Sequence, residues 1–402
     1  MRMEIKPSRA RGSIKAPPSK SMAHRLLICA AMCEGVSTVR GISNCEDVAA
    51  TLDCLAALGI KVERSGDDIT VYGKNFGCAV PISPLMCRES GSTLRFLIPT
   101  ALLSGKTTVF YGAKSLMQRP MGVFEKLCAE RHMTFIADGD SIAVKGPLKG
   151  GEFEVVGNIS SQFISGLLFA LPCCREDSKI RIVTPVESRS YINMTLEALH
   201  LFGIDADWVD EHTLYVKGAQ KYRPTDISVE GDWSGAAFPD ALNLFGGDVA
   251  LSGLNPQSIQ GDRVYRRYYE MLSSGVPTIH IGDCPDLGPI LFAVAAAKCG
   301  GIFSGTKRLK IKESDRAAAM AQELEKFGAS VTVYDDAVVV YPKEFHAPTG
   351  VLYGHNDHRI VMALSVLLTV TGGAIDGVEA VSKSYPDFFE HLLKLGVDVN
   401  TI

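Results

Sequence analysis

The sequence predicts an α/β protein of two domains, each built from three copies of one helix–strand–helix–hairpin unit. Its 402 residues exceed the roughly 150 of a typical single domain. One pattern of elements restarts at intervals of about 70 residues, with a single shorter interval. In most copies a glycine closes the second helix, as expected for a C-terminal cap. The copies start near Lys20, Ser90, Ser160, Asp232, Asp286 and Asn356.

The first copy shows the pattern most clearly. A helix is expected after Lys20, because apolar residues recur there at spacings of four and three. A strand over 36–42 follows, and then a second helix that ends at Gly59. Two short apolar runs flank Ser-Gly-Asp-Asp within 60–71, which indicates a hairpin.

Six copies are too many for one core, so we divide them three and three. Residues 19–228 are expected to form the first domain, and residues 1–18 with 229–402 the second. The fourth copy is short, and the sixth ends abruptly at the C-terminus. The first 18 residues carry two strand-like segments. We therefore expect the N-terminal segment to complete the second set of copies.

Composition excludes several classes of protein. The net charge of −4, from 41 basic and 45 acidic residues, argues against a general nucleic-acid or membrane-surface binder. No apolar run reaches the ~18 residues of a membrane helix. The N-terminus lacks the apolar core of a signal peptide. Because the 11 cysteines are odd in number and scattered, we expect a cytoplasmic protein with reduced thiols.

The starts of the first helices combine capping residues with bases. Capping alone explains Ser, Asp and Asn at a helix start, and a single Arg or Lys is ordinarily a solvated surface charge. Here the bases recur at equivalent places in successive copies. Helix N-termini bind anions, and Arg pairs bidentately with phosphate and carboxylate groups. The pattern therefore predicts a site for a substrate with several anionic groups. The bases are Lys20, Arg25, Arg95, Arg119, Arg189, Lys312, Arg316, Arg359 and Lys383.

Two acidic residues stand among these bases, Asp286 and Glu313. Neighbouring cations lower the pKa of a carboxyl group, so each is a candidate acid–base residue. The alternatives are a helix cap for Asp286 and an ion pair with Lys312 or Arg316 for Glu313. His355 and His358 have no accompanying ligand set, so no metal site is expected.

Eight short motifs, in this order, resemble those of the 5-enolpyruvylshikimate-3-phosphate (EPSP) synthase family. Each motif alone is weak, but eight in one order are specific, and the resemblance covers the whole chain. It implies two domains of three βαβαββ repeats each, forming an inside-out α/β barrel, with the active site in the interdomain cleft. The motifs lie at 18–21, 89–95, 118–120, 160–162, 229–232, 312–316, 356–359 and 383–387.

The same resemblance implies the reaction. The family transfers the enolpyruvyl group of phosphoenolpyruvate to the 5-hydroxyl of shikimate 3-phosphate and releases phosphate. Asp286 should accept the 5-hydroxyl proton, Glu313 should deliver a proton to the methylene carbon, and Lys20 should assist. No metal or organic cofactor is implied. We expect a cytoplasmic monomer without nucleic-acid or membrane partners.

Binding residues are carried over from the family's motifs. For shikimate 3-phosphate they are Lys20, Ser21, Arg25, Ser160, Ser161, Gln162, Ser188, Tyr191, Asp286 and Lys312. For phosphoenolpyruvate they are Lys20, Gly91, Arg95, Arg119, Gln162, Arg316, Arg359 and Lys383.

Two alternatives stay open. A UDP-N-acetylglucosamine enolpyruvyl transferase would carry a reactive cysteine on the loop 111–119, which has none. A repeat-built binding protein without catalysis would have no use for Asp286 and Glu313. The sequence offers no explanation for Asp240, inside an apolar helix pattern, or for Arg308, where the family often has Asn.

Overall fold

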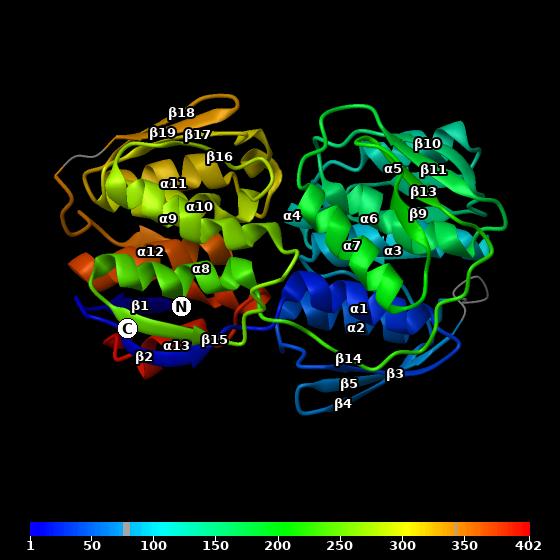
Figure 1. Ribbon diagram of the computed structural model, residues 1–402, viewed down its shortest axis with the longest axis horizontal. Coiled ribbons are helices and arrows are strands. Elements are labelled where there is room, and N and C mark those ends of the chain that lie inside the picture. Colours follow the sequence, from blue (N-terminus) through cyan, green and yellow to red (C-terminus); the bar gives the residue numbers. More distant parts are fainter. Residues whose placement is uncertain (75–80, 342–343) are drawn as a thin grey trace. The chain divides into compact units, whose positions relative to one another are not determined.

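The computed structural model describes residues 1–74, 81–341 and 344–402. The chain forms two compact units (Figure 1). The first, Pro18–Glu230, is here called the central unit. The second, called the terminal unit, joins Met1–Pro17 to Gly231–Ile402. These limits differ by one or two residues from those expected from the sequence.

The central unit alternates helices and strands throughout. Its helices are α1 (Lys20–Met32), α2 (Glu46–Ala57), α3 (Gly91–Ala101), α4 (Lys114–Met117), α5 (Gly122–Glu130), α6 (Ser161–Ala170) and α7 (Arg189–Leu201). Its strands are β3 (Gly35–Arg40), β4 (Lys61–Ser65), β5 (Asp68–Gly73), β6 (Leu85–Met86), β7 (Thr108–Tyr111), β8 (Thr134–Ala137), β9 (Ser141–Lys145), β10 (Gly151–Val155), β11 (Ser178–Ile182), β12 (Ala206–Trp208), β13 (Thr213–Val216) and β14 (Ile227–Ser228).

These strands form three four-stranded sheets of one design, in the orders β14-β3-β5-β4, β6-β7-β9-β8 and β10-β11-β13-β12. In each sheet a parallel pair is extended by an antiparallel hairpin. The predicted βαβαββ repeat is therefore confirmed. The first repeat takes its opening strand, β14, from the end of the unit, and this pairing closes the ring of three repeats.

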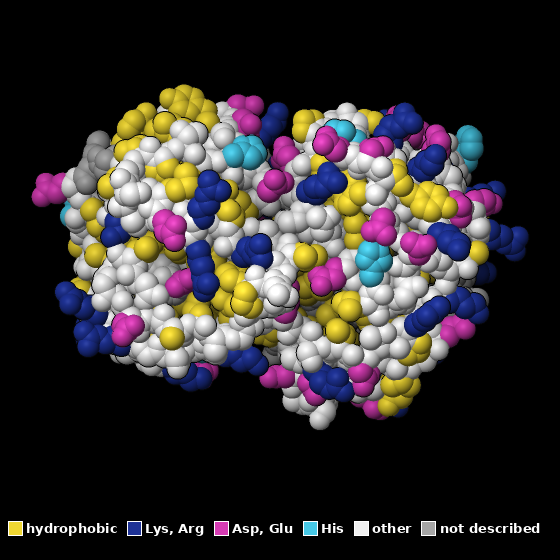
Figure 2. All heavy atoms as spheres, in the orientation of Figure 1, with side chains coloured by type: hydrophobic (Ala, Val, Ile, Leu, Met, Phe, Trp, Pro, Cys, Tyr) yellow, Lys and Arg dark blue, Asp and Glu magenta, His cyan; other side chains and the backbone are white. Residues whose placement is uncertain are grey.

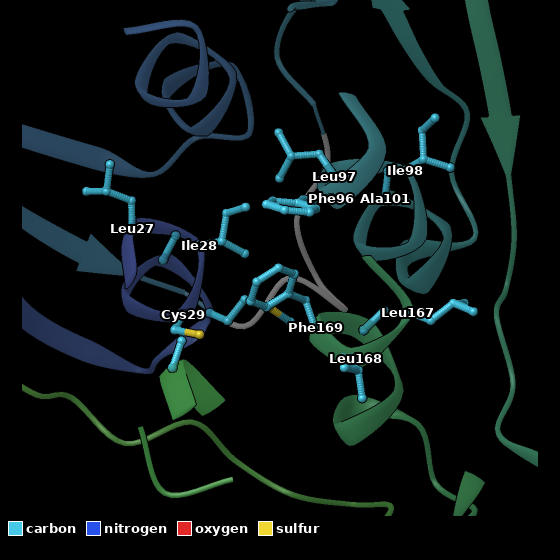
Figure 3. Close-up of a cluster of buried hydrophobic side chains, with 14 of the residues drawn as sticks. Leu27, Ile28, Cys29, Phe96, Leu97, Ile98, Ala101, Leu167, Leu168 and Phe169 are labelled. Carbon is cyan, nitrogen blue, oxygen red and sulfur yellow. The ribbon is translucent and has the colours of Figure 1, made fainter. Parts of the chain in front are cut away.

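The core of the central unit lies among α1, α3 and α6. In Figure 3 the side chains of Ile28, Phe96 and Phe169 lie close together between these helices. The rings of Phe96 and Phe169 meet edge to face with centroids 5.3 Å apart. Nearly every residue of these three helices is buried, because each helix is covered on all sides. Their polar residues concentrate at the N-terminal ends.

The terminal unit is also built from alternating helices and strands, but its first two strands come from the N-terminus of the chain. Its helices are α8 (Trp233–Ala241), α9 (Tyr265–Ser274), α10 (Gly288–Ala297), α11 (Arg316–Glu325), α12 (His358–Thr371) and α13 (Phe388–Lys394). Its strands are β1 (Arg2–Ile5), β2 (Arg11–Lys15), β15 (Asp248–Ser252), β16 (Thr278–His280), β17 (Gly301–Ser304), β18 (Ser330–Val333), β19 (Ala337–Tyr341), β20 (Leu352–Tyr353), β21 (Gly373–Asp376) and β22 (Val399–Thr401).

The N-terminal segment completes two sheets of this unit, as expected. Strand β2 pairs in parallel with β15, and these two strands make up the sheet of the short fourth repeat. Strand β1 lies between β21 and β22 and pairs antiparallel with both. In the order β20-β21-β1-β22 it takes the place that β19 has in β16-β17-β19-β18.

Most of the glycines predicted to end second helices adopt the left-handed conformation of a C-terminal cap. Gly59, for example, has φ +77°. Gly275 ends α9 as predicted, but it differs from the others because its φ of 170° is extended backbone. In the second repeat, which lacks the glycine, His132 takes the left-handed position with φ +54°.

Charges of both signs are interspersed over the face shown in Figure 2. None of the described helices is long and apolar enough to cross a membrane.

The pairing of β1 predicts a measurable loss of stability for Ile5→Ala. Ile5 is fully buried and pairs with Gly373 on one side and Val399 on the other. Removing its side chain should cost about 2–5 kcal/mol. In a Trp208→Phe background, the buried Trp233 reports urea unfolding of the terminal unit alone. An unchanged midpoint would contradict the assigned pairing, and the exposed Arg11→Ala serves as the control.

Candidate active site

Helices α1, α3 and α6 of the central unit and α8, α10 and α12 of the terminal unit are here called the inner helices. Five of these six begin with a side-chain cap. Asp357, for example, accepts a hydrogen bond of 2.9 Å from the backbone N–H of Arg359 at the start of α12. Helix α10 differs, since its N-cap is Leu287 without a capping bond. Asp286 lies before it, in a 3-10 turn over Pro285–Leu287. The helix-cap alternative for Asp286 is therefore wrong, and its carboxylate pairs with other groups. The other caps are Ser19, Ser90, Ser160 and Asp232.

In the central unit, Arg25 is buried, and its hydrogen-bond partners among the described residues are neutral. Its guanidinium donates to the hydroxyl of Thr195 at 2.9 Å and to the backbone oxygens of Ser21 and Tyr191 at 2.7 and 2.8 Å. It also lies 5.0 Å from the centre of the Phe96 ring. Burial lowers the pKa of Arg25 to about 10. A cation held only by neutral partners is suited to bind an anion.

The starts of α3 and α6 meet through a second group of side chains. Gln162 accepts a hydrogen bond of 2.8 Å from Arg95 and donates one of 2.9 Å to the hydroxyl of Ser92. A Cβ atom on Gly91 would lie 2.9 Å from Nη1 of Arg119 and 3.4 Å from Nη1 of Arg95. A side chain at this position would therefore require the end of the Arg119 side chain to shift.

Lys20 begins α1 and pairs with Asp47, at 2.6 Å between Nζ and Oδ2. Both side chains are mostly buried, with 14% and 12% exposed. Asp47 stands in the first turn of α2, where a negative charge is favoured by the helix dipole. It fixes the ammonium of Lys20 near the other bases of the central unit.

In the terminal unit, one guanidinium organises three carboxylates. Arg316 is 1% exposed and donates from Nε to Asp357 at 2.8 Å, from Nη1 to Asp286 at 2.8 Å and from Nη2 to Glu313 at 2.7 Å. A further bond of 3.4 Å joins Nη2 to Asp357. Four of the five N–H groups of an arginine are thereby engaged. Burial lowers the pKa of Arg316, but the three carboxylates outweigh this and raise it above its ordinary value.

Asp286 is surrounded by cations. Besides Arg316, its oxygens lie 3.0 Å from Nη2 of Arg359 and 3.4 Å from Nζ of Lys312. Burial raises the pKa of Asp286, but Arg359, Lys312 and Arg316 together outweigh it and hold the pKa well below its ordinary value. The carboxylate is therefore ionised at neutral pH. Burial in turn lowers the pKa of Lys312.

Two further bases complete this group. Nη1 of Arg359 donates to the hydroxyl of Ser234 at 2.6 Å, which joins the starts of α8 and α12. Lys383 is buried and donates to the backbone oxygen of Asn356 at 2.6 Å. Asp286 and Arg359 thus lie at the starts of α10 and α12, and Lys383, Arg316 and Lys312 come from neighbouring segments of the unit.

The predicted residues fall into two groups, one in each unit. The central unit brings together Gln162, Arg95, Arg119 and Gly91, and the terminal unit brings together the predicted acid–base pair and its cations. Near Arg25, Ser188 is buried with a left-handed φ of +56° at the start of α7. The remaining predicted residues, Ser160 and Ser161, stand at the start of α6.

Arg189 does not belong to either group. It donates to the backbone oxygen of Glu211 at 2.7 Å and lies 3.8 Å from the centre of the Trp208 ring. Its inclusion among the anion-binding bases is therefore wrong. Its position resembles that of the other bases in the repeat, but the side chain packs on its own sheet.

Sequence reasoning missed several polar partners of the bases: Asp47, Thr195, Ser234 and Asp357. Asp357 lies within the motif 356–359, and its fully buried carboxylate both caps α12 and binds Arg316. The acidic first turn of α2 was the one available signal for Asp47. Nothing in the local pattern indicates Thr195, which reaches Arg25 from α7.

Asp240 and Arg308 are explained by their contacts. Asp240 accepts a hydrogen bond of 2.7 Å from the hydroxyl of the buried Tyr265 and one of 3.0 Å from Asn243. Arg308 is buried and donates to the backbone oxygen of Gly282. Among the described residues no group of three or more His, Cys, Asp or Glu side chains could hold a metal ion.

Comparison with known proteins gives one family. The sequence pattern described as EPSP synthase (3-phosphoshikimate 1-carboxyvinyltransferase) matches residues 5–392. The chain belongs to the EPSP synthase family. The 3-phosphoshikimate 1-carboxyvinyltransferase of Clostridium kluyveri is 36% identical over 420 residues, covering 99% of this chain and 98% of the relative. That of Clostridium perfringens is 38% identical over 417 residues, covering 98% and 97%.

Solved structures support the EPSP synthase fold. The EPSP synthase from Acinetobacter baumannii superposes with a TM-score of 0.80 at 24% identity, with complete coverage of both chains. The enolpyruvyl transferase NikO from Streptomyces tendae has a TM-score of 0.77 at 14% identity, covering 99% and 98%. At these identities the likeness establishes the fold alone, and the predicted fold class is confirmed.

The low pKa of Asp286 predicts how stability depends on pH. Its contribution should be complete above its ordinary pKa of 3.8 and be lost as the pH falls toward the lower pKa of the folded state. Asp286→Asn should cost about 2 kcal/mol at pH 7, as expected for lost hydrogen bonds to charged groups. The difference from wild type should shrink below about pH 4. Urea unfolding at a series of pH values measures this.

The matched control is Asp335→Asn. Asp335 pairs with Lys310 at 3.1 Å, but its side chain is 77% exposed, so its loss should have little effect at any pH. A stability difference for Asp286→Asn that stays constant down to pH 2 would contradict the ion-pair assignment.

Proposed function

We infer that this protein is a 3-phosphoshikimate 1-carboxyvinyltransferase. It transfers the enolpyruvyl group of phosphoenolpyruvate to the 5-hydroxyl of shikimate 3-phosphate and releases phosphate, a step of aromatic amino-acid biosynthesis. Membership of the family supports the reaction. The observation that carries the residue roles is the pair of carboxylates, Asp286 and Glu313, held by the single guanidinium of Arg316.

We assign phosphoenolpyruvate to the bases at the start of α3 and around Asp286, as the family's motifs imply. Both the phosphate and the carboxylate of this substrate pair well with arginine forks. Arg316 has one N–H left after its four carboxylate bonds, so Arg359 and Lys383 should make the main contacts in the terminal unit. In the central unit, phosphoenolpyruvate binds at the start of α3. The assigned residues are Lys20, Gly91, Arg95, Arg119, Gln162, Arg316, Arg359 and Lys383.

We assign the phosphate of shikimate 3-phosphate to the start of α6 and to Arg25. Hydroxyl groups and N–H groups at a helix start are suitable donors to a phosphate. In the terminal unit Asp286 and Lys312 bind the shikimate hydroxyls. The assigned residues are Lys20, Ser21, Arg25, Ser160, Ser161, Gln162, Ser188, Tyr191, Asp286 and Lys312.

The chemistry is an addition followed by an elimination. Glu313 enters this step in its protonated form, which can still accept the hydrogen bond from Arg316. It delivers its proton to the methylene carbon of phosphoenolpyruvate, and the 5-hydroxyl oxygen attacks the neighbouring carbon as Asp286 takes the hydroxyl proton. The product is a tetrahedral intermediate with a new methyl group. In the second step the C–O bond to phosphate breaks, Asp286 returns its proton to the departing phosphate, and a methyl proton returns to Glu313. Lys20 assists these proton movements and stabilises the charge.

A carboxylate with a very low pKa is a weak base, but substrate binding can raise the pKa of Asp286. Arg359 is the largest of the charge effects that lower the pKa of Asp286, followed by Lys312. When these cations also bind substrate anions, their effect on Asp286 decreases. The pKa of Asp286 then rises toward a value suited to proton transfer.

We further propose that the protein acts as a cytoplasmic monomer and needs no cofactor, nucleic acid or membrane. These expectations rest on composition and on the family's chemistry. The alternative acceptor, UDP-N-acetylglucosamine, is tested by measuring phosphate release from phosphoenolpyruvate.

The decisive experiment measures phosphate release from phosphoenolpyruvate with either acceptor. Release should require shikimate 3-phosphate. Asp286→Asn and Glu313→Gln should each lower kcat by about 10²–10⁴, the usual range for a general acid or base. Binding of shikimate 3-phosphate should persist in both variants, since its cations are unchanged. Glu325→Gln, on the exposed side of α11, is the control.

Release with UDP-N-acetylglucosamine instead would overturn the proposed substrate. No release with either acceptor would favour a non-catalytic binding protein. Near-normal turnover in both acid–base variants would show that the residue roles are wrong.

A further inference from the structure

A fully buried carboxylate lies outside the site described above. Glu323, on α11, accepts hydrogen bonds of 2.8 Å from Nζ of Lys326, 3.0 Å from the backbone N–H of Tyr353 and 3.0 Å from Nε2 of His355. Its side chain is 0% exposed. Burial raises the pKa of Glu323, but these three donors outweigh it and lower the pKa below its ordinary value. A buried, ionised glutamate is uncommon, so its purpose needs explaining.

Glu323 shares one face of α11 with Arg316. The two residues are seven positions apart, which places them on the same side of a helix. Arg316 binds Asp357 at one end of this face, and Glu323 binds Tyr353 and His355 at the other. Helix α11 therefore holds the segment 353–357 at both ends.

The backbone between these two attachments is strained. His355 and Asn356 have φ values of +50° and +52°, in the left-handed region. For residues other than glycine, each such conformation costs on the order of 1–3 kcal/mol and persists only when the surrounding contacts enforce it. The attachments to α11 contribute to that constraint, together with the bond from the backbone N–H of Asp357 to the oxygen of Gly354.

The strained turn carries groups that hold three of the proposed phosphoenolpyruvate ligands. The backbone oxygen of Asn356 accepts the hydrogen bond from Lys383. Asp357 binds the guanidinium of Arg316 and the backbone N–H of Arg359. A shift of this turn would move all three cations together.

We propose that Glu323, acting through His355, is a positioning residue for phosphoenolpyruvate binding. It fixes the turn at His355 and Asn356 and thereby sets the places of Lys383, Arg316 and Arg359. This inference rests on the proposed function, since it takes those three cations to bind phosphoenolpyruvate. Glu323 itself is buried and touches neither substrate.

The test compares substitutions that break the Glu323–His355 bond with matched ones that keep it. Glu323→Gln removes the charge, and His355→Ala removes the donor. His355→Gln retains an N–H donor at this position. Glu325→Gln changes an exposed glutamate of the same helix and leaves the turn untouched. Phosphate release gives kcat and the two KM values, and hydrogen exchange of the amides in 354–359 reports the turn.

Glu323→Gln and His355→Ala should each raise the KM for phosphoenolpyruvate about tenfold, as expected for one lost hydrogen bond to a charged group. The KM for shikimate 3-phosphate should change less than about twofold, since none of the three cations is among the residues assigned to that substrate. Exchange at the turn should be faster in both variants. His355→Gln and Glu325→Gln should resemble wild type.

Two results would overturn the inference: an unchanged KM for phosphoenolpyruvate in either disruptive variant, or equal increases in both KM values, which indicate a general loss of structure. If Glu323→Gln does not fold, His355→Ala carries the test. If wild type releases no phosphate, the proposed function fails separately. The positioning role is then tested by calorimetric binding of phosphoenolpyruvate and by hydrogen exchange of the amides in 354–359. Unchanged exchange in His355→Ala would overturn that role.

Discussion

The buried guanidinium of Arg316 is the interaction on which the terminal unit's chemistry depends. Removing a charged group from water costs several kcal/mol, and that cost is offset only by close partners with good geometry. Arg316 meets this condition with Asp286, Glu313 and Asp357 at 2.7–2.8 Å. The same three bonds fix the two carboxylates that we assign to proton transfer. Stability and the placement of the catalytic groups therefore have one cause.

The repeat explains why such groups gather where they do. Each inner helix is buried along its length, so polar side chains are tolerated mainly at its ends. At the N-terminal end they find free N–H groups and a favourable dipole for anions. Three helices per unit begin in this way, and each start adds a cap, a base or a carboxylate. The N-terminal strands β1 and β2 complete the sheets that hold the helices of the terminal unit.

Much of the fold could be predicted because the repeat makes its pattern visible several times. The role of the N-terminal segment followed from the copies that lacked strands. Local conformation was less predictable: Gly275 is extended, and Asp286 lies in a 3-10 turn and not at a helix cap. In both cases the residue type allows two conformations, and tertiary contacts choose between them.

Individual bases of the site could be predicted from their repetition, but their partners could not. Arg189 stands at an equivalent place in its repeat, yet it packs on Trp208. Asp47 and Glu323 lie in helices whose local sequence is ordinary for exposed faces. Their burial follows from long-range packing, which a single sequence does not show. The same holds for Thr195, whose hydroxyl meets Arg25 across 170 positions of sequence.

The most direct test of this account is the pH profile of kcat for Arg316→Lys. Lysine keeps the charge but cannot bind Asp286, Glu313 and Asp357 at once, because its ammonium lacks the planar fork. The account predicts that kcat falls at least about tenfold. The acid limb should move to higher pH, because Asp286 loses the hydrogen bond from the guanidinium and its pKa rises. A wild-type kcat with an unmoved acid limb would contradict the claim that Arg316 organises the acid–base pair.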